Sequence, residues 1–271
     1  GSAKSGTGHF WSMTKSSVAL LILVPLEGGF PVLRTRQSTL HLIRCCAVLF
    51  ANICFYTGLA TMPMADAVAI AFVMPFLMLV LGHYVLGEEI GMRRVIACAV
   101  GFVGTLLVIQ PAFDDVGWPA LLPLVVAVVF SLFMLVTRQI AKHTDPIGLQ
   151  GINGLMAVAI LAPLLIVFQS SGLALFDLKT PEGSEYLMLG TIGVIGTLAH
   201  LLMTWSLRFA PSATLAPMQY LEIPFATLIG WLVFLEWPNA LASLGILITI
   251  SAGLYIVIRE RAISRAAPPA V

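Results

Sequence analysis

One acidic residue, Glu222, lies near the middle of a long apolar stretch of this 271-residue chain. An ionisable group inside a bilayer costs roughly 2.5–3.5 kcal/mol, so it calls for a partner or a purpose. Pro224 lacks a backbone donor and frees a carbonyl one turn earlier, near Tyr220. We expect this bend to offer Glu222 to a cavity, either as a counter-charge for a cationic or amine-bearing substrate or as a proton-coupling carboxylate. A structural ion pair with a neighbouring helix is the alternative.

Two basic side chains inside apolar stretches could act with Glu222. Lys15 could bind a substrate carboxylate, neutralise Glu222, or extend to the nearby outer surface. His200 could transfer protons near neutral pH, although a lone histidine in a helical bundle is more often a packing residue.

Further candidates follow from helical spacing. Asn52 and Tyr56 are four residues apart, so one helix face could present an amide and a phenol to a ligand. Gln150 and Asn153 form a similar pair at three-residue spacing. Such groups also hold helices together, and both interpretations stay open. The predicted substrate-binding set is Glu222, Lys15, Asn52, Tyr56, Met74, Asn153, His200, Gln219 and Tyr220.

The elements that carry these residues are predicted to cross a membrane. Hydrophobic residues make up 59% of the chain and charged residues 10%, whereas a soluble domain carries roughly 25% charged residues. The apolar blocks have the length of a helix that crosses a hydrocarbon core of roughly 30 Å, and they lack the alternation of barrel strands. The sequence predicts an all-α integral membrane protein with about nine visible helices. The predicted spans are residues 9–26, 42–59, 65–86, 93–110, 118–137, 147–168, 186–207, 213–235 and 240–258.

Other classes of protein are excluded by composition and motif. A net charge of +1 gives no basic face for nucleic acid. The four cysteines lie in or beside apolar stretches without metal-ligand spacing, so we expect packing residues and no cofactor. The chain has no HExxH, GxSxG or phosphate-loop motif and no paired catalytic carboxylates, which disfavours an enzyme.

The distribution of Lys and Arg predicts the orientation of the chain. Positive loops stay in the cytoplasm, and this places the C-terminus there. The richer side holds Arg34, Arg36, Arg44, Arg93, Arg94, Arg138, Lys142, Arg208, Arg259, Arg261 and Arg265, and the other holds Lys4 and Lys179. An odd number of spans would put residue 1 outside the cytoplasm, yet nothing before the first span resembles a cleaved signal peptide. We therefore expect a tenth span before residue 1, with Gly1–Gly8 either the end of that helix and its loop or an added leader.

The chain also repeats itself at an interval of 148 to 149 residues. Pro63 pairs with Pro211, Pro75 with Pro224, Phe76 with Phe225, Gly82 with Gly230, Glu88 with Glu236, and Gly104 with Gly253. Glu88 falls on the Arg-rich side and Glu236 on the Arg-poor side, so the copies are predicted to face opposite ways, as in secondary transporters. The predicted domains are residues 1–112 and 113–271. Met74 stands directly before Pro75, as Ile223 stands directly before Pro224. Met74 therefore corresponds, in the repeat, to the residue next to Glu222.

Four acidic or hydroxyl residues beside turns are interpreted as helix caps. Glu88 and Glu236 stand at turns near helix starts, where a carboxylate is favourable. Asp66 and Ser212 come shortly after prolines and resemble N-caps.

Two long stretches resemble the EamA branch of the drug/metabolite transporter superfamily. They are LGEEIGMRRVIACAVGFVGTLLVI at residues 86–109 and APSATLAPMQYLEIPFATLIGWLVFLEWPNALASLGILITISAGLYIVIRER at residues 210–261. The resemblance implies ten transmembrane helices in two inverted repeats and a central cavity that opens alternately to each side. Members of that family move amino acids, vitamins, nucleosides, adenosylmethionine, sugars or amphiphilic drugs. Lys15 matches a position where the family often carries a cation. The sequence matches this pattern from its second helix onward, and we expect the first helix to precede residue 1.

These observations predict a secondary transporter of a small metabolite in the bacterial inner membrane. Its expected partners are the substrate and membrane lipids, with association into a homodimer or a larger membrane complex left open. The alternative, from a different class, is a non-transporting scaffold subunit derived from a transporter fold, which the missing helix would favour.

Overall fold

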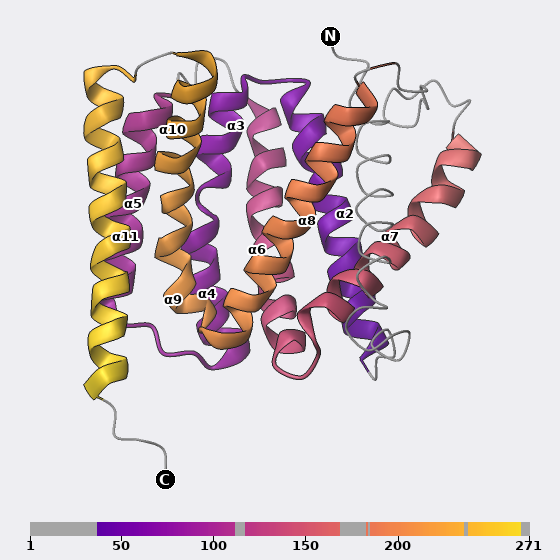
Figure 1. The fold of residues 1–271 in the computed structure, drawn as a ribbon, viewed down its shortest axis with the longest axis horizontal. Coiled ribbons are helices and arrows are strands. Elements are labelled where there is room, and N and C mark those ends of the chain that lie inside the picture. The colour runs from indigo at the N-terminus through magenta and orange to yellow at the C-terminus, as the bar shows by residue number, and fades with distance from the viewer. Residues whose placement is uncertain (1–36, 112–116, 169–182, 184, 236–237, 267–271) are drawn as a thin grey trace. The chain divides into compact units, whose positions relative to one another are not determined.

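The structure is a computed structural model that describes residues 37–111, 117–168, 183, 185–235 and 238–266. All regular elements in these ranges are helices, as the sequence predicts (Figure 1). They are α2 (Ser38–Leu59), α3 (Met64–Ala71), α4 (Met74–Leu86), α5 (Met92–Ile109), η4 (Trp118–Ala120), α6 (Leu121–Ala141), α7 (Pro146–Phe168), α8 (Glu185–Phe209), α9 (Ser212–Leu215), η5 (Ala216–Leu221), α10 (Glu222–Phe234) and α11 (Ala240–Ala266).

Seven helical stretches of the described ranges are long and apolar enough to cross a bilayer. They begin at Ser38, Met64, Met92, Trp118, Pro146, Glu185 and Ala240. The predicted span at residues 9–26 lies outside the described residues. The predicted span at 213–235 is divided among α9, η5 and α10, so it is not one continuous helix.

The chain divides into two compact units. The first unit contains the described residues up to Phe50 together with Val136–Phe209, and the second contains Ala51–Leu135 together with the described residues from Ala210 onward. The first unit is therefore built on α7, α8 and the first part of α2. The second is built on α3, α4, α5, α9, η5, α10 and α11, with most of α6.

The outward faces of these helices are apolar, as lipid requires. On α11, Leu247 is 63% exposed and Ile258 is 66% exposed, whereas Thr249 on the same helix is fully buried. A soluble helix would have the reverse pattern, because its apolar stripe faces the core. The interior of the second unit instead accommodates small and polar side chains.

Helices α5 and α11 run side by side in the second unit (Figure 1) and cross through glycines. A Cβ on Gly245 would lie 2.5 Å from the carbonyl oxygen of Gly104, closer than side chains tolerate. The missing side chains thus allow the two backbones to touch, which is how small residues stabilise helix pairs in membranes. The α5–α11 pair forms the support on which the η5 segment packs.

Prolines explain why two predicted spans are interrupted. Pro75 cannot donate to the carbonyl of Ala71, and the chain passes through Phe72 and Val73 between α3 and α4. In the later stretch, Pro217 lies near the start of a 3₁₀ segment, η5, and Pro224 lies in the first turn of α10; η5 separates α9 from α10. Both interruptions lie in the second unit.

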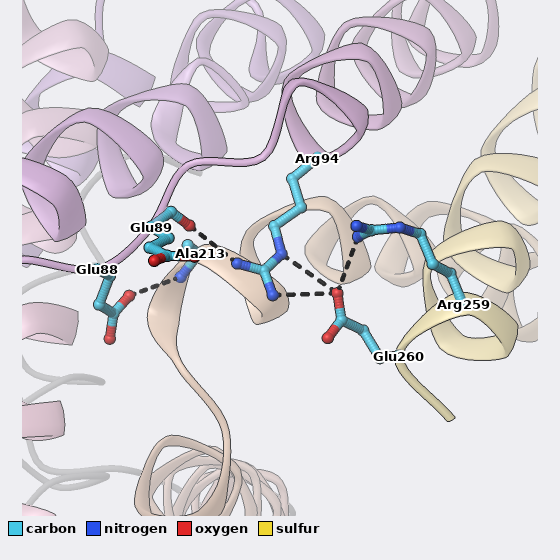
Figure 2. Close-up of polar contacts among 6 residues, drawn as sticks. All are labelled: Glu88, Glu89, Arg94, Ala213, Arg259 and Glu260. Atoms are coloured by element: carbon cyan, nitrogen blue, oxygen red, sulfur yellow. Dashed lines mark hydrogen bonds and ion pairs between the residues drawn. The ribbon is translucent and has the colours of Figure 1, made fainter. Parts of the chain in front are cut away.

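A carboxylate from the loop after α4 caps helix α9. Glu88 accepts hydrogen bonds from the Ser212 backbone N–H (3.2 Å) and the Ser212 hydroxyl (2.6 Å). It also accepts one from the Ala213 N–H at 2.9 Å (Figure 2). The capping role predicted for Glu88 is thus confirmed, for a helix more than a hundred residues away. The N-cap prediction for Ser212 and Asp66 is wrong, because Pro211 and Pro63 occupy those positions and both residues lie in the first turn. Glu236 lies outside the described residues.

An ion-pair cluster joins the start of α5 to the end of α11. Arg94 donates to Glu260 Oε1 from Nε (3.2 Å) and Nη2 (3.0 Å), and it donates from Nη1 to the carbonyl of Glu89 (3.0 Å). Arg259 approaches the same Glu260 oxygen at 3.3 Å (Figure 2). The Arg-bearing ends of α5 and α11 therefore lie together at one end of this unit.

The first unit contains a buried cation, Arg44, which was counted from the sequence among the basic residues of the Arg-rich side. Arg44 lies inside α2 and is fully buried. Its Nε donates to Thr137 Oγ1 (2.8 Å) and its Nη2 to Gln150 Oε1 (2.7 Å), which ties α2 to α6 and α7. Gln150 therefore holds helices together, and Arg44 is buried inside the unit although it was counted with the cations of the Arg-rich side.

Candidate binding cavity

A cavity of about 310 Å³ lies within the second unit. Its walls come from the later part of α2, from α3 and the start of α4, from α6, and from the η5–α10 junction. Four predicted residues line it: Asn52, Met74, Gln219 and Glu222. Both helix interruptions border this space, so the prolines that interrupt the helices also shape the cavity. A volume near 300 Å³ is at the small end of pockets that hold small molecules.

The 3₁₀ geometry of η5 brings Gln219 and Glu222 to one side of the chain. A 3₁₀ helix has about three residues per turn, so side chains at i and i+3 eclipse one another. Gln219 lies in η5, and Glu222 follows it at the first position of α10. Both line the cavity, while the intervening Tyr220 does not. Pro217 and Pro224 thus determine which side chains face the cavity.

The polar groups of the cavity are mainly acceptors. Within the described part of the chain, no side chain forms a hydrogen bond or ion pair with the Glu222 carboxylate. Gln219 Nε2 lies 2.8 Å from Met78 Sδ, and the buried Gln219 Oε1 has no hydrogen-bond partner in the described ranges. A buried acceptor without a partner is costly. A ligand that brings N–H donors or a positive charge would therefore find the Glu222 carboxylate in place, with the amide of Gln219 beside it.

Three phenylalanines provide aromatic surface around these acceptors. Phe55 comes from α2, Phe72 from the break after α3, and Phe130 from α6. Phenyl rings favour stacking with a planar ligand and attract cations over their faces. The cavity therefore combines flat apolar walls with a carboxylate and two amide side chains, those of Asn52 and Gln219.

Tyr220 lies behind the cavity wall. Its side chain is fully buried, and its hydroxyl donates to the carbonyl of Phe72 at 3.1 Å. The two rings stack with centroids 5.9 Å apart and planes inclined by 26°. Tyr220 therefore contacts the cavity through Phe72, which differs from the direct contact that the sequence predicts.

Of the predicted pair on α2, Asn52 lines the cavity and Tyr56 does not. The α2 residues that line the cavity are Ala51, Asn52 and Phe55. At about 100° per residue, the middle of that face lies roughly 90° from Tyr56. The half-buried Tyr56 instead packs edge-on against Phe55, with ring centroids 5.9 Å apart.

The remaining predicted residues belong to the first unit or lie outside the description. Asn153 in α7 accepts a hydrogen bond on its carbonyl from the Cys45 thiol at 3.7 Å. His200 in α8 accepts one on its carbonyl from the Thr204 hydroxyl at 2.7 Å. Neither lines the cavity of the second unit. Lys15 lies outside the described residues.

Comparison with known proteins places this geometry in a family. The EamA-like transporter family matches residues 3–110 and again residues 117–259. A riboflavin transporter of Rhizobium johnstonii is 28% identical over 259 residues, covering 94% of this chain and 82% of that protein. An S-adenosylmethionine uptake transporter of Rickettsia felis is 24% identical over 252 residues, covering 93% and 82%.

A solved structure supports the fold alone. It superposes with a TM-score of 0.76 at 20% identity, covering 94% of this chain and 89% of the other. The helical membrane fold and the two family matches agree with the resemblance in the sequence. This multi-pass membrane chain therefore belongs to the EamA-like transporter family.

Proposed function

We propose that the chain is a secondary transporter that moves a planar nitrogen heterocycle, carrying N–H donors or a positive charge, across the bacterial inner membrane. The observation that carries this proposal is that the Glu222 carboxylate, which has no partner among the described residues, lines one cavity together with three phenylalanines. Riboflavin and S-adenosylmethionine, named for the relatives, both contain such a heterocycle. They are the first two compounds to test.

Interrupted helices around the cavity support alternating access. In secondary transporters, substrate sites lie where transmembrane helices are discontinuous, because unwound segments expose polar groups at the bilayer midplane. Here α3–α4 and α9–η5–α10 are both discontinuous, and both border the cavity. Residues 1–112 and 113–271 would be the two inverted repeats, which exchange an outward and an inward opening.

The arginines at one end of the second unit favour a cytoplasmic C-terminus. Arg94 and Arg259 meet at Glu260 there, so the start of α5 and the end of α11 share that end. Loops rich in Lys and Arg stay in the cytoplasm. Cysteine labelling of a single engineered site near Arg265, from each side of right-side-out vesicles, tests this orientation.

Uptake by proteoliposomes tests the function. The purified chain should accumulate labelled riboflavin or S-adenosylmethionine, and Glu222→Gln should reduce the accumulation. Loss of one charge-assisted hydrogen bond predicts a KM increase of roughly 10- to 150-fold. Glu89→Gln is the matched control, because Glu89 is exposed in the loop before α5.

Absence of uptake would contradict the proposal under one condition. The riboflavin transporter of Rhizobium johnstonii, reconstituted in the same way, must be active. If the relative transports and this chain moves neither compound, the proposed substrate class is wrong. Co-purification of this chain with a stoichiometric assembly would then favour the scaffold alternative.

A further inference from the structure

The carbonyl of Phe72 lacks its regular helical partner. In a continuous helix it would accept from the N–H of Phe76, but that N–H donates to the carbonyl of Val73 at 3.1 Å. Pro75, one residue earlier, has no N–H to offer. A buried backbone carbonyl needs a partner. The Tyr220 hydroxyl supplies it at 3.1 Å.

The Tyr220 ring is fixed by its surroundings. It stacks on the Phe72 ring and is fully buried. On another side it packs against Gly101 of α5, where an added Cβ would lie 2.5 Å from Tyr220 Cδ2. The glycine leaves room for the ring and little freedom to move. Tyr220 therefore links α5 to the break between α3 and α4 through its contacts with Gly101 and Phe72.

Tyr220 also belongs to the segment that carries the acceptors. Gln219 precedes it and Glu222 follows two residues later, both facing the cavity. Because Phe72 lines the same cavity, one hydroxyl joins the aromatic wall to the acceptor-bearing segment. The distance between wall and acceptors decides whether a planar ring can stack while its donors reach Glu222.

We propose that Tyr220 is a positioning residue, which holds Phe72 against the cavity and so sets substrate affinity without touching the substrate. The transport test of this inference depends on the proposed function. The contact between Tyr220 and Phe72 does not depend on the proposed function.

Tyr220→Phe is the direct test, since it removes the hydroxyl and keeps the ring. With riboflavin and S-adenosylmethionine as probes, KM should rise about two- to tenfold, as expected for one hydrogen bond, at equal amounts of reconstituted protein. The increase should disappear in a Phe72→Leu background, because both changes act through the same ring. Tyr84→Phe is the matched control: Tyr84 is on α4 in the same unit and is 81% exposed.

Hydrogen exchange gives a readout that needs no substrate. In nanodiscs, the backbone amides of residues 68–74, 76 and 77 should exchange faster in Tyr220→Phe than in wild type or Tyr84→Phe. Unchanged exchange overturns the proposal, whatever the transport data show. Faster exchange with an unchanged KM, or a KM increase that persists in full with Phe72→Leu, overturns the positioning role. If wild type moves neither probe, the proposed function fails, and the exchange data alone decide whether Tyr220 holds Phe72.

Discussion

Replacement of Gly245 by alanine should separate helices α5 and α11. The new Cβ would lie 2.5 Å from the Gly104 carbonyl oxygen, 2.8 Å from Val108 Cγ2 and 2.9 Å from Leu107 Cβ. Ordinary contact begins at 3.4 Å, so the helices must move apart by 0.9 Å at this point. The nearest atom belongs to the backbone, which cannot rotate away as a side chain could.

The expected loss of stability follows from two opposing effects. Overpacking costs about 1–3 kcal/mol, and alanine gains about 0.5–1 kcal/mol over glycine within a helix. We expect a net loss of about 1 kcal/mol in the free energy of unfolding. Gly230→Ala is the matched control, because a Cβ at that position of α10 meets nothing within 4 Å.

The measurement is the free energy of unfolding in bicelles by steric trapping, for both variants in parallel. Gly230→Ala should be as stable as wild type or more so. If Gly245→Ala were equally stable, the close approach of α5 and α11 at Gly104 would be refuted.

Three further changes test other parts of the structure. Glu88→Gln should lower the free energy of unfolding by about 1–2 kcal/mol, because an amide oxygen replaces a charged acceptor of three hydrogen bonds. Thermal unfolding checks this prediction, and an equal loss of stability in Glu89→Gln would contradict it. Phe130→Ala should weaken the binding of aromatic probes about tenfold, since it removes a stacking surface; equilibrium binding with unchanged affinity would contradict that role. Arg44→Ala should destabilise the chain by about 1–3 kcal/mol for each of the two side-chain oxygens that it leaves without a donor. Arg44→Lys should restore only part of this, because lysine cannot reach Thr137 and Gln150 together. Unfolding in bicelles checks both, and full rescue by lysine would contradict the geometry.

The helices could be predicted because apolar length specifies the spans, and Pro224 indicated a bend near Tyr220 because it has no N–H to donate. The break between α3 and α4 was not predicted, because residues 65–86 read as one apolar span. The tertiary partners could not be predicted in the same way. The residues around Glu88 predicted a turn and a capping role for this carboxylate. They did not predict that the capped helix is α9, because that depends on how distant segments pack. Arg44 was counted with the cations of the Arg-rich side near the start of its span, because charge alone does not show that the helix begins earlier, at Ser38, and buries this side chain.

The candidate cavity was predicted in part, for a related reason. The repeat and the prolines pointed to Met74, Gln219 and Glu222, which line it together. Tyr220 was placed with them because it is adjacent in sequence, but the 3₁₀ turn directs it toward Phe72 and Gly101. The phenylalanine walls were not predicted, because a phenylalanine inside an apolar span gives no sequence signal that separates a cavity from a lipid-facing surface.

Substrate uptake by Glu222→Gln tests the central proposal most directly. Wild type, Glu222→Gln and Glu89→Gln should be reconstituted at equal density and assayed with riboflavin and S-adenosylmethionine. We expect wild type and Glu89→Gln to accumulate one of these compounds, and Glu222→Gln to show a KM increase of roughly 10- to 150-fold. Transport by Glu222→Gln with the wild-type KM and rate would contradict the assignment of the cavity as the substrate site.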